Sequence, residues 1–475
     1  MSIISSLLNT ARALSIHSKG AEIAGRNIAN VNNPEYARQQ MIIKDQGSLG
    51  TVRNWVDLGI KTEEIRNIRS SILDNQIIRE QFSSGSLEMQ SQFLRTIQSI
   101  LGERLDRSFD SASSIQSPEA LLSPSGLTNS IDQFLNAFSE VAANPTDDSQ
   151  KAVLLEKANI LVERFHSIDS QLTQIDTDIA DQIDENVTKA NNLLAEIATL
   201  NSEITRLELA TGRTALELRD SRQGRLEELG KLMNFETEQM DTSSGHLNVF
   251  VRDASNNQVL LVDGIEQVAS MSYDGTNFAA GTGPTTVTIN GGELYGAHSV
   301  RTNELATLMT DLDSLAEGLV NEVNAAYNPL ATVGEDFFVA ANITAGDIAV
   351  TGTLTPANLK TTNTADAGAN ELALAVADLI NTDITFSNGY VGTFTEHMVS
   401  ISTDVGKAIN TVDLQKENQR VVEQMLMAER DSLGGVNMDE EMTDIIRYQR
   451  AFQASARVIS TMDTLLDTVV NQMKR

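Results

Sequence analysis

The side chains most able to do chemistry in this chain are its five histidines. They stand at His17, His166, His246, His298 and His397. A helix-borne metal site needs two histidines one turn apart, and a nucleophilic site needs a histidine within reach of a recognisable serine or cysteine motif. The sequence offers neither arrangement. We therefore interpret the five as isolated surface or boundary histidines and predict no catalytic residue.

One run of carboxylates, Asp439-Glu440-Glu441, is the other candidate for chemistry. Three adjacent acids can hold a cation. However, they stand where a helix is expected to begin, and negative charge in a first helical turn complements the helix dipole and caps free backbone N–H groups. We favour capping over metal binding.

Other reactive motifs are missing from the sequence. Cysteine is absent, which excludes thiolate chemistry and mildly suggests a chain that meets an oxidising exterior. The glycines of Gly281-Thr282-Gly283-Pro284 lack the strand and helix context of a nucleotide-binding loop. We therefore predict no cofactor and no metal, and expect a protein that is not an enzyme.

Composition limits the classes of partner. A length of 475 residues predicts more than one domain. A formal charge of −30 disfavours nucleic acid and anionic membrane surfaces as partners. The N-terminus lacks the basic and apolar regions of a cleaved signal, and no apolar run is long enough to span a bilayer. We expect that any export proceeds without a cleaved signal.

The elements that organise the chain are two amphipathic helices at its ends. Apolar and small residues recur at spacings of three and four, a pattern typical of helices that bury one narrow seam in a partner helix. The N-terminal stripe comprises Ile4, Leu7, Ala11, Leu14, Ser18, Ala21, Gly25 and Ile28. The C-terminal stripe comprises Met438, Ile445, Tyr448, Phe452, Ser455, Ile459, Met462, Leu466 and Val469. We expect the two helices to pair with each other or to pack against copies of themselves.

Between the ends, the periodicity of apolar residues predicts mostly helices. Expected helices cover 62–105, 127–143, 148–210, 216–233, 304–323, 370–381 and 394–430. The apolar positions of the longest include Val153, Leu161, Phe165, Ile168, Leu172, Ile175, Ile179, Ile183, Val187, Leu194, Ile197, Ile204 and Leu207. Alternation from Leu247 to Val262, with turn signals at Asp274-Gly275 and Asn290-Gly291-Gly292, predicts a small antiparallel β module.

The predicted fold class is mainly α: a long helical bundle or coiled-coil rod built from N- and C-terminal segments, with a small β-rich outer module. The expected domains are 1–60 plus 433–475 as a terminal helical inner-tube domain, 61–239 plus 299–329 plus 394–432 as a helical rod, 240–298 as the β module, and 330–393 as an Ala/Thr-rich outer or variable segment.

Two motifs carry a family resemblance. The segment from Asn27 to Tyr36 resembles the N-terminal signature of flagellar axial proteins (rod, hook and hook-associated proteins), with Glu35 where that signature usually has glycine. The segments 435–442 and 446–459 closely resemble the C-terminus of the FlgK family of flagellar hook-associated proteins. Leu218-Arg219-Asp220 and Gly334-Glu335-Asp336-Phe337-Phe338 are further similarities. The resemblance covers roughly the first 60 residues, residues 150–235 and the last 80.

The resemblance implies a structural subunit of the bacterial flagellum, exported by the flagellar type III apparatus and secreted to the extracellular junction between hook and filament. Implied partners are copies of itself in a ring, hook protein below, hook-associated protein 3 as the second junction protein above, and an export chaperone. Small seam residues would allow close helix approach in an inner tube. The residues expected at the assembly seam are Leu7, Ala11, Leu14, Ala21, Ile28, Asn30, Tyr36, Met438, Ile445, Tyr448, Phe452, Ile459, Met462 and Leu466.

Three alternatives stay open. A hook or distal rod protein shares the N-terminal signature, but the long helices of 150–235 and the segment Val436–Glu441 fit a junction protein better. An extracellular scaffold or grafted enzyme would have to use residues 240–395, near which His246, His298 and His397 stand without an HExxH motif. A coiled-coil scaffold unrelated to flagella would not need the Asn-rich stop at Asn30–Pro34.

Overall fold

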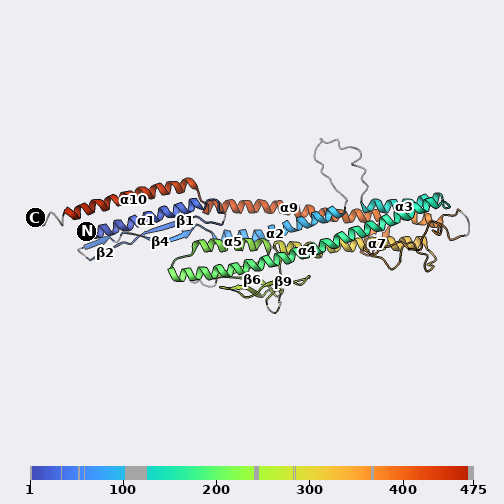
Figure 1. Cartoon of the computed structure of the whole chain (residues 1–475), viewed down its shortest axis with the longest axis horizontal. Coiled ribbons are helices and arrows are strands. Elements are labelled where there is room, and N and C mark those ends of the chain that lie inside the picture. Colours follow the sequence, from blue (N-terminus) through green and yellow to red (C-terminus); the bar gives the residue numbers. More distant parts are fainter. Residues whose placement is uncertain are drawn as a thin grey trace, which may run out of the picture. The chain divides into compact units, whose positions relative to one another are not determined.

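The structure, a computed structural model, describes residues 3–33, 35–51, 54–57, 59–101, 126–239, 245–281, 283, 285–364 and 368–468. The chain divides into two compact units. Unit 1 comprises Met1–Ser84, Val187–Gly292 and Asn418–Arg475, and unit 2 comprises Gly85–Asn186 and Glu293–Glu417. Both units are therefore assembled from segments far apart in the sequence. Three long helices, α2 (Ser71–Leu101), α4 (Asp148–Thr211) and α9 (Phe394–Gly434), contribute residues to both (Figure 1).

Unit 1 holds the two terminal helices, α1 (Ile3–Ala29) and α10 (Met438–Asp467), together with α5 (Leu216–Leu232). After α1 come β1 (Gln39–Asp45), β2 (Ser48–Thr51), β3 (Asn54–Asp57) and β4 (Ile60–Asn67). β1 pairs with β4 and β2 pairs with β3, both antiparallel. Ile60 and Ile65 of β4 pack with Met41 of β1 against Ile16 and Ile23 of α1, which makes a small core at this end of unit 1.

The β module also lies in unit 1. One antiparallel sheet has the order β5-β6-β7-β8, and a second has the order β11-β10-β9. Their bounds are β5 (Glu236–Gln239), β6 (Leu247–Arg252), β7 (Gln258–Asp263), β8 (Glu266–Gln267), β9 (Met271–Tyr273), β10 (Phe278–Ala280) and β11 (Thr285–Thr286). The predicted β-rich module is thus confirmed, because alternating apolar residues such as Val249 and Val251 are buried on these strands.

Unit 2 contains α3 (Leu127–Ala143), α6 (Gly292–Ser299), a π-helical turn η2 (Val300–Leu305), α7 (Ala306–Tyr327), α8 (Glu371–Ala377) and η3 (Asp378–Asn381), with a small hairpin of β12 (Ile384–Thr385) and β13 (Val391–Gly392). Several aromatic residues form a cluster in its core. Phe337 lies 5.6 Å from Phe134, 5.3 Å from Phe138 and 5.4 Å from Tyr327, measured between ring centroids.

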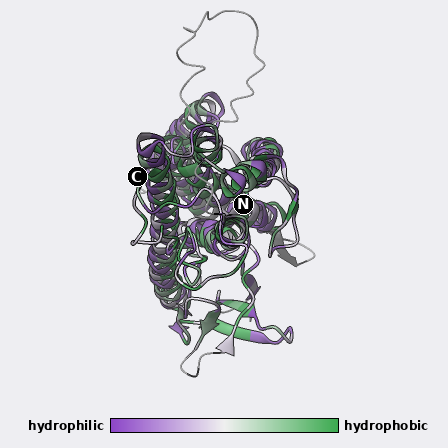
Figure 2. Ribbon diagram, turned by 90° about the vertical axis from the view of Figure 1, so that its right-hand side faces the viewer, coloured by the Kyte–Doolittle hydropathy of each residue, from purple (hydrophilic) through white to green (hydrophobic). Residues whose placement is uncertain are grey.

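The long helix α4 follows its predicted heptad pattern over most of its length. Apolar residues from Leu161 to Ile204 are buried at the expected spacing, although Val153 and Leu207 near the two ends are exposed and are corrections to the predicted stripe. The helix begins after Asp147, whose carboxylate accepts a hydrogen bond from the Ser149 N–H at 2.8 Å. In Figure 2 the helices carry hydrophobic residues along some faces and hydrophilic residues along others, as amphipathic helices do.

Two predicted boundaries are wrong. Residues 60–67 form β4 instead of the start of a helix, because they pair with β1 in the register Met41↔Ile65. The helix begins only at Ser71, after Ser70, and Ile72 in its first turn is exposed. Helix also returns earlier than predicted, at Gly292, which adopts a positive φ of 80° that the sequence pattern had marked as a turn. The end of the predicted helix at Leu105 lies outside the described residues.

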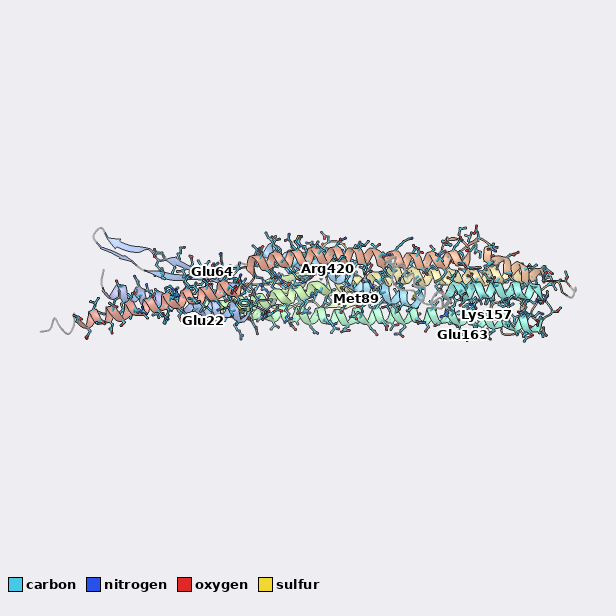
Figure 3. The ribbon with its side chains drawn as sticks, turned by 90° about the horizontal axis from the view of Figure 1, so that it is seen from above. Glu22, Glu64, Met89, Lys157, Glu163 and Arg420 are labelled. Carbon is cyan, nitrogen blue, oxygen red and sulfur yellow. The ribbon has the colours of Figure 1, made fainter. Side chains whose placement is uncertain are left out.

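Charged side chains mark the exposed faces. Glu22 on α1, Glu64 on β4, and Glu163 and Arg420 on the long helices are exposed (Figure 3). Within the described residues, none of the helices combines the length and apolar content needed to cross a lipid bilayer.

Candidate functional site

The terminal helices α1 and α10 pack against each other in an antiparallel pair, so the two chain ends lie at the same end of unit 1 (Figure 1). Tyr448 of α10 lies against Gly20 of α1: an atom at the Cβ position of residue 20 would be 2.6 Å from the tyrosine ring. Tyr448 also packs on the cluster of Ile16, Ile23 and Met41. The two terminal helices therefore pair with each other within a single chain, which is one of the two arrangements expected for them.

A buried carboxylate anchors the start of α10. The Glu441 side chain is only 3% exposed and pairs with Arg38, whose Nε lies 2.6 Å from Oε1. Asn27 of α1 donates from Nδ2 to the other Glu441 oxygen at 3.0 Å. Removing one member of a buried ion pair typically costs about 3–5 kcal/mol, since the other charge is left without its partner. Three segments are thus joined at one point, although Asn27 and Glu441 lie more than 400 residues apart in the sequence.

Asn27 is the centre of this network. Its Oδ1 accepts hydrogen bonds from the Gln39 N–H at 3.0 Å and from the Tyr36 hydroxyl at 2.8 Å. Its Nδ2 also donates to the Gln39 carbonyl at 3.0 Å. Burial raises the pKa of Tyr36 to about 12, so the hydroxyl keeps its proton and remains a donor at neutral pH. The side chain of Asn27 therefore fixes the turn that leads from α1 into β1.

Asp220 of α5 ties the same turn to the rest of unit 1. Its carboxylate accepts hydrogen bonds from Asn67 at 2.7 Å, from Arg69 at 2.8 Å and from the Ala37 N–H at 3.2 Å. Burial raises the pKa of Asp220, and the charge of Arg69 acts in the opposite direction. Glu35 lies against Gly224 of α5, where a Cβ would be 2.6 Å from the Glu35 carboxyl carbon. The residue that departs from the usual signature is therefore accommodated by a glycine opposite it.

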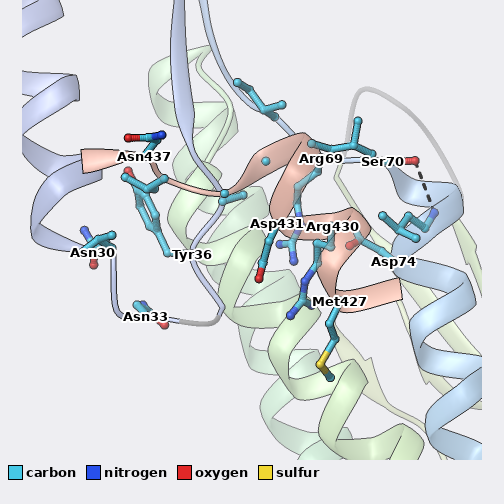
Figure 4. A pocket seen from close by; sticks show the side chains of 18 of the residues that line it. Asn30, Asn33, Tyr36, Arg69, Ser70, Asp74, Met427, Arg430, Asp431 and Asn437 are labelled. Atoms are coloured by element: carbon cyan, nitrogen blue, oxygen red, sulfur yellow. Dashed lines mark hydrogen bonds and ion pairs between the residues drawn. The ribbon is translucent and has the colours of Figure 1, made fainter. Parts of the chain in front are cut away.

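A groove of about 820 Å³ opens beside this network. It is lined by the turn Asn30–Ala37, by Ile68–Asp74 and by the junction between α9 and α10 (Figure 4). Ser70 begins α2 here, with its Oγ accepting from the Leu73 N–H at 3.4 Å. The predicted site residues Asn30, Tyr36 and Met438 line the groove.

On α1, the predicted seam does not face α10. The buried residues of α1 are Ile16, Ile23, Ala24 and Asn27, with Gly20 between them. At 3.6 residues per turn, the stripe from Leu7 to Ile28 is centred about 150° around the helix from this buried face. Ala11 and Ser18 are exposed, and Leu7, Leu14, Ala21, Gly25 and Ile28 are half-buried. Beyond the helix's own neighbouring residues, none of the described residues lies within 4 Å of a Cβ placed on Gly25.

On α10, the predicted seam does face α1. Ile445, Tyr448, Ser455, Ile459, Met462 and Leu466 are half-buried along one side of the helix. Phe452 and Met438 keep exposures of 37% and 48%. Within the described part of α10, Glu441 is the residue that is fully buried. Val469 lies outside the described residues. The role of all these positions in assembly stays a prediction.

The carboxylate run at 439–441 does not cap α10 in the way expected. The N-cap is Asn437, whose Oδ1 accepts from the N–H groups of Asp439 at 3.0 Å and Glu440 at 3.4 Å. Glu441 instead points to Arg38 and Asn27. Across the described residues, no group of three or more His, Asp or Glu side chains is placed to hold a metal ion.

His397 is the one histidine that contradicts the surface or boundary interpretation. It is 1% exposed in unit 2, stacked on Tyr390 at 4.6 Å between centroids and hydrogen-bonded to Asn388 at 2.9 Å. The aromatic residues that surround it come from a hairpin, which sequence spacing did not associate with it.

Sequence reasoning missed Arg38 and undervalued Asn27, Asp220 and Glu441. Three of these stand inside motifs that carried the family resemblance. A signal for these residues was available in the sequence. Polar residues in such motifs do not contribute to an amphipathic apolar stripe, so they need another role. Their partners could not be assigned, because the contacts join residues far apart in the sequence: Glu441 with Asn27 and Arg38, and Asp220 with Ala37.

Comparisons with known proteins agree on one family. The family model described as "Flagellar hook-associated protein FlgK helical domain" matches residues 115–338, and "Flagellar basal body rod FlgEFG protein C-terminal" matches residues 434–473. Flagellar hook-associated protein 1 of Bacillus subtilis is 24% identical, over 98% of this chain and 98% of its own. The proteins of the same name from Salmonella typhimurium and Escherichia coli are 22% identical over 98% of this chain and 100% of theirs.

A solved structure supports the fold. The flagellar hook junction protein FlgK from Burkholderia pseudomallei superposes with a TM-score of 0.60 and 13% identity, over 76% of this chain and 100% of that one. The predicted class, mainly helical with small antiparallel sheets, is confirmed. The family models and the relatives therefore lead to one conclusion: the chain resembles flagellar hook-associated protein 1 (FlgK) along nearly its whole length.

Proposed function

We propose that this chain is a structural subunit of the bacterial flagellum that forms the junction between hook and filament, and that it assembles through its terminal helices. Its relatives carry the name flagellar hook-associated protein 1, and the similar solved structure is titled a hook junction protein. Like these relatives, it is an extracellular component that assembles with other axial proteins of the flagellum.

The observation that supports self-assembly is that α1 has two apolar faces. One face is covered by α10 and β4 within the chain. The opposite face presents Leu7, Leu14, Ala21 and Ile28 alternating with Ala11, Ser18 and Gly25, at the spacing of a heptad pattern. Small residues on such a stripe permit close approach of another helix. A second copy of this chain is the partner that we propose for this face.

The finer arrangement is also part of the proposal. Copies of the chain form a ring, with hook protein below and hook-associated protein 3 above, after delivery by an export chaperone. The protein has no enzymatic role in this scheme, in keeping with the dispersed histidines. The runner-up is a hook or distal rod protein, because the C-terminal match is to a model named for a flagellar basal body rod protein.

Deletion of the gene tests the place in the flagellum. Electron microscopy of the mutant cells should show hooks without filaments, and flagellin should accumulate in the medium. Absence of hooks would instead assign the chain to the hook or rod, and normal filaments would refute the flagellar assignment.

Substitutions on α1 test the proposed assembly face. Leu14→Asp places a charge on the outer stripe and is expected to reduce swimming and filament number at least tenfold when expressed in the deletion strain. Leu8→Asp is the matched control, because Leu8 is also an exposed leucine of α1 but lies off the stripe. Equal loss in both variants, or in neither, would contradict the assignment. Phe452→Asp instead places a charge on the side of α10 that faces α1; it should leave the middle of the chain soluble and folded yet stop incorporation into the junction, and normal junctions would refute the assignment of Phe452 to the seam.

A further inference from the structure

The α1–α10 pair needs a device that sets its register. The α10 side that faces α1 is a continuous apolar stripe, with residues such as Ile445, Phe452 and Ile459 at repeating spacings of three and four. Sliding such a stripe along its partner by one helical turn replaces one apolar contact with another at little cost. Apolar contact alone therefore does not select one alignment of the two helices.

Two contacts in the structure are specific to a single alignment. Tyr448 lies on Gly20, and Glu441 bonds Asn27. The step from Glu441 to Tyr448 is seven residues forward on α10, and the step from Asn27 to Gly20 is seven residues back on α1. Both contacts therefore belong to the same antiparallel register, which also places Phe452 opposite Ile16 and Ser455 opposite Ala13.

The partners of Glu441 are held in place independently of α10. The Arg38 N–H donates to the Gly434 carbonyl at 3.2 Å, and the Arg38 carbonyl accepts from the Ile68 N–H at 2.9 Å. Asn27 is bound on both sides by Gln39 and by Tyr36. The socket for one carboxylate is thus formed by the segment after α1, and α10 supplies the carboxylate.

A shifted register would fill neither contact. If α10 moved by one turn so that Phe452 lay on Gly20, Glu441 would leave Arg38 and Asn27, and Tyr448 would meet the Cβ of Ala24. A buried carboxylate without its partners is strongly unfavourable, whereas a well-paired one adds little net stability. Such a group is better suited to excluding wrong alignments than to holding the helices together.

We infer that Glu441, through Arg38 and Asn27, and Tyr448, through Gly20, are positioning residues that fix the register of α10 on α1. This inference goes beyond the proposed function, because it concerns how one copy presents its terminal helices. It applies regardless of which partner the helices later assemble with. The charged and polar neighbours of this contact are Arg447, which lies 5.2 Å from the Tyr448 ring centroid, its partner Asp444, and His17.

Disulfide trapping in the full chain tests the inference, since the sequence has no cysteine to interfere. The pair Ala13→Cys and Ser455→Cys reports the observed register. The pair Ala13→Cys and Ile459→Cys reports a shift of one turn. In the otherwise unchanged chain, the first pair is expected to form at least tenfold more disulfide than the second, because a disulfide requires Cα atoms within about 7 Å.

The ratio of disulfide formed by the first pair to disulfide formed by the second is the readout. Glu441→Gln combined with Tyr448→Leu is expected to lower this ratio at least tenfold while the far-UV circular dichroism stays unchanged. Glu440→Gln is the matched control, because Glu440 also pairs with Arg38, at 3.1 Å, but its side chain is 60% exposed. That variant should keep the original ratio. Exchanging the charges, with Arg38→Glu and Glu441→Arg together, should recover most of the ratio lost when Glu441 alone is changed.

Two outcomes would overturn the inference. An unchanged ratio in the double variant would mean that the short link Gly435–Asn437 sets the register by itself. Loss of both cross-links would mean that these residues hold the helices together instead of aligning them. Neither outcome bears on the deletion experiment, so failure of this inference and failure of the proposed function are distinguishable.

Discussion

At the scale of single residues, the structure separates side chains whose pKa is changed mainly by a bonded partner from those whose pKa is changed mainly by burial. Glu208 illustrates the first kind, since hydrogen bonding from Arg219 lowers the pKa of its carboxyl. His397 illustrates the second, since burial lowers the pKa of its imidazole. Its ring stacks on Tyr390, and none of the described residues forms a hydrogen bond with its Nδ1. A neutral imidazole is therefore preferred in the folded state.

This preference predicts a pH dependence of stability. The folded pKa of His397 lies below the unfolded value of 6.5, so below that pH the unfolded state binds more protons. The contribution of His397 to the free energy of unfolding is therefore complete above pH 6.5 and is lost as pH falls toward the folded pKa. Thermal unfolding measured every half unit across this window should show a smaller slope with pH for His397→Gln than for the wild type. Equal slopes would show that His397 does not titrate with unfolding.

At the scale of elements, caps and close approaches decide where helices begin and which faces meet. α10 begins where Asn437 accepts hydrogen bonds from two N–H groups, directly after the break at Gly434-Gly435. Gly434 is required at its position because a Cβ there would lie 2.2 Å from the Ile68 carbonyl oxygen. A few local contacts thus end α9, turn the chain and start the helix that pairs with α1.

The cap on α10 can be tested separately from its pairing. Asn437→Ala should destabilise the first turn by about 1 kcal/mol, because two N–H groups lose their acceptor. Hydrogen exchange of the amides at Asp439 and Glu440 should then be about fivefold faster, while Asn437→Ser, which keeps an acceptor, should change it little. Unaltered exchange in the alanine variant would indicate that tertiary contacts alone hold this turn.

At the scale of the whole molecule, charge opposes association. The chain carries 65 acidic and 35 basic residues, and each copy brings a formal charge of −30 to any assembly. Such repulsion favours a soluble single chain, and salt screens it over a length of about 10 Å at 0.1 M. An apolar α1 face would therefore associate more readily when ions are added.

Salt should accordingly promote self-association. Raising sodium chloride from about 0.02 to 0.5 M shortens the screening length several-fold, and sedimentation velocity should then show a larger fraction of oligomer. Leu14→Asp should show less of this increase than Leu8→Asp. Weaker association at high salt would mean that ion pairs between copies, and not apolar faces, dominate the contact.

Much of the fold followed from local patterns. The helices at 127–143, 216–232 and 394–434 and the β module were predicted close to their observed bounds, because periodicity, N-caps and glycine turns act over a few residues. The segment 60–67 was not, because its strand exists only through pairing with β1. In the same way, the terminal stripes could be recognised in the sequence, but the hydrogen-bond network of Asn27 could not.

By itself, the sequence determined that both ends are amphipathic helices, that no catalytic motif is present, and which family the terminal motifs resemble. Only the tertiary structure decided that α10 covers the Gly20 face of α1 and leaves the residues of the Leu7–Ile28 stripe half-buried or exposed. It also decided that Glu441 reaches Arg38 and Asn27. The physical reason is that helical periodicity is a local property, whereas the choice of face and partner depends on side chains that meet only after distant segments pack together.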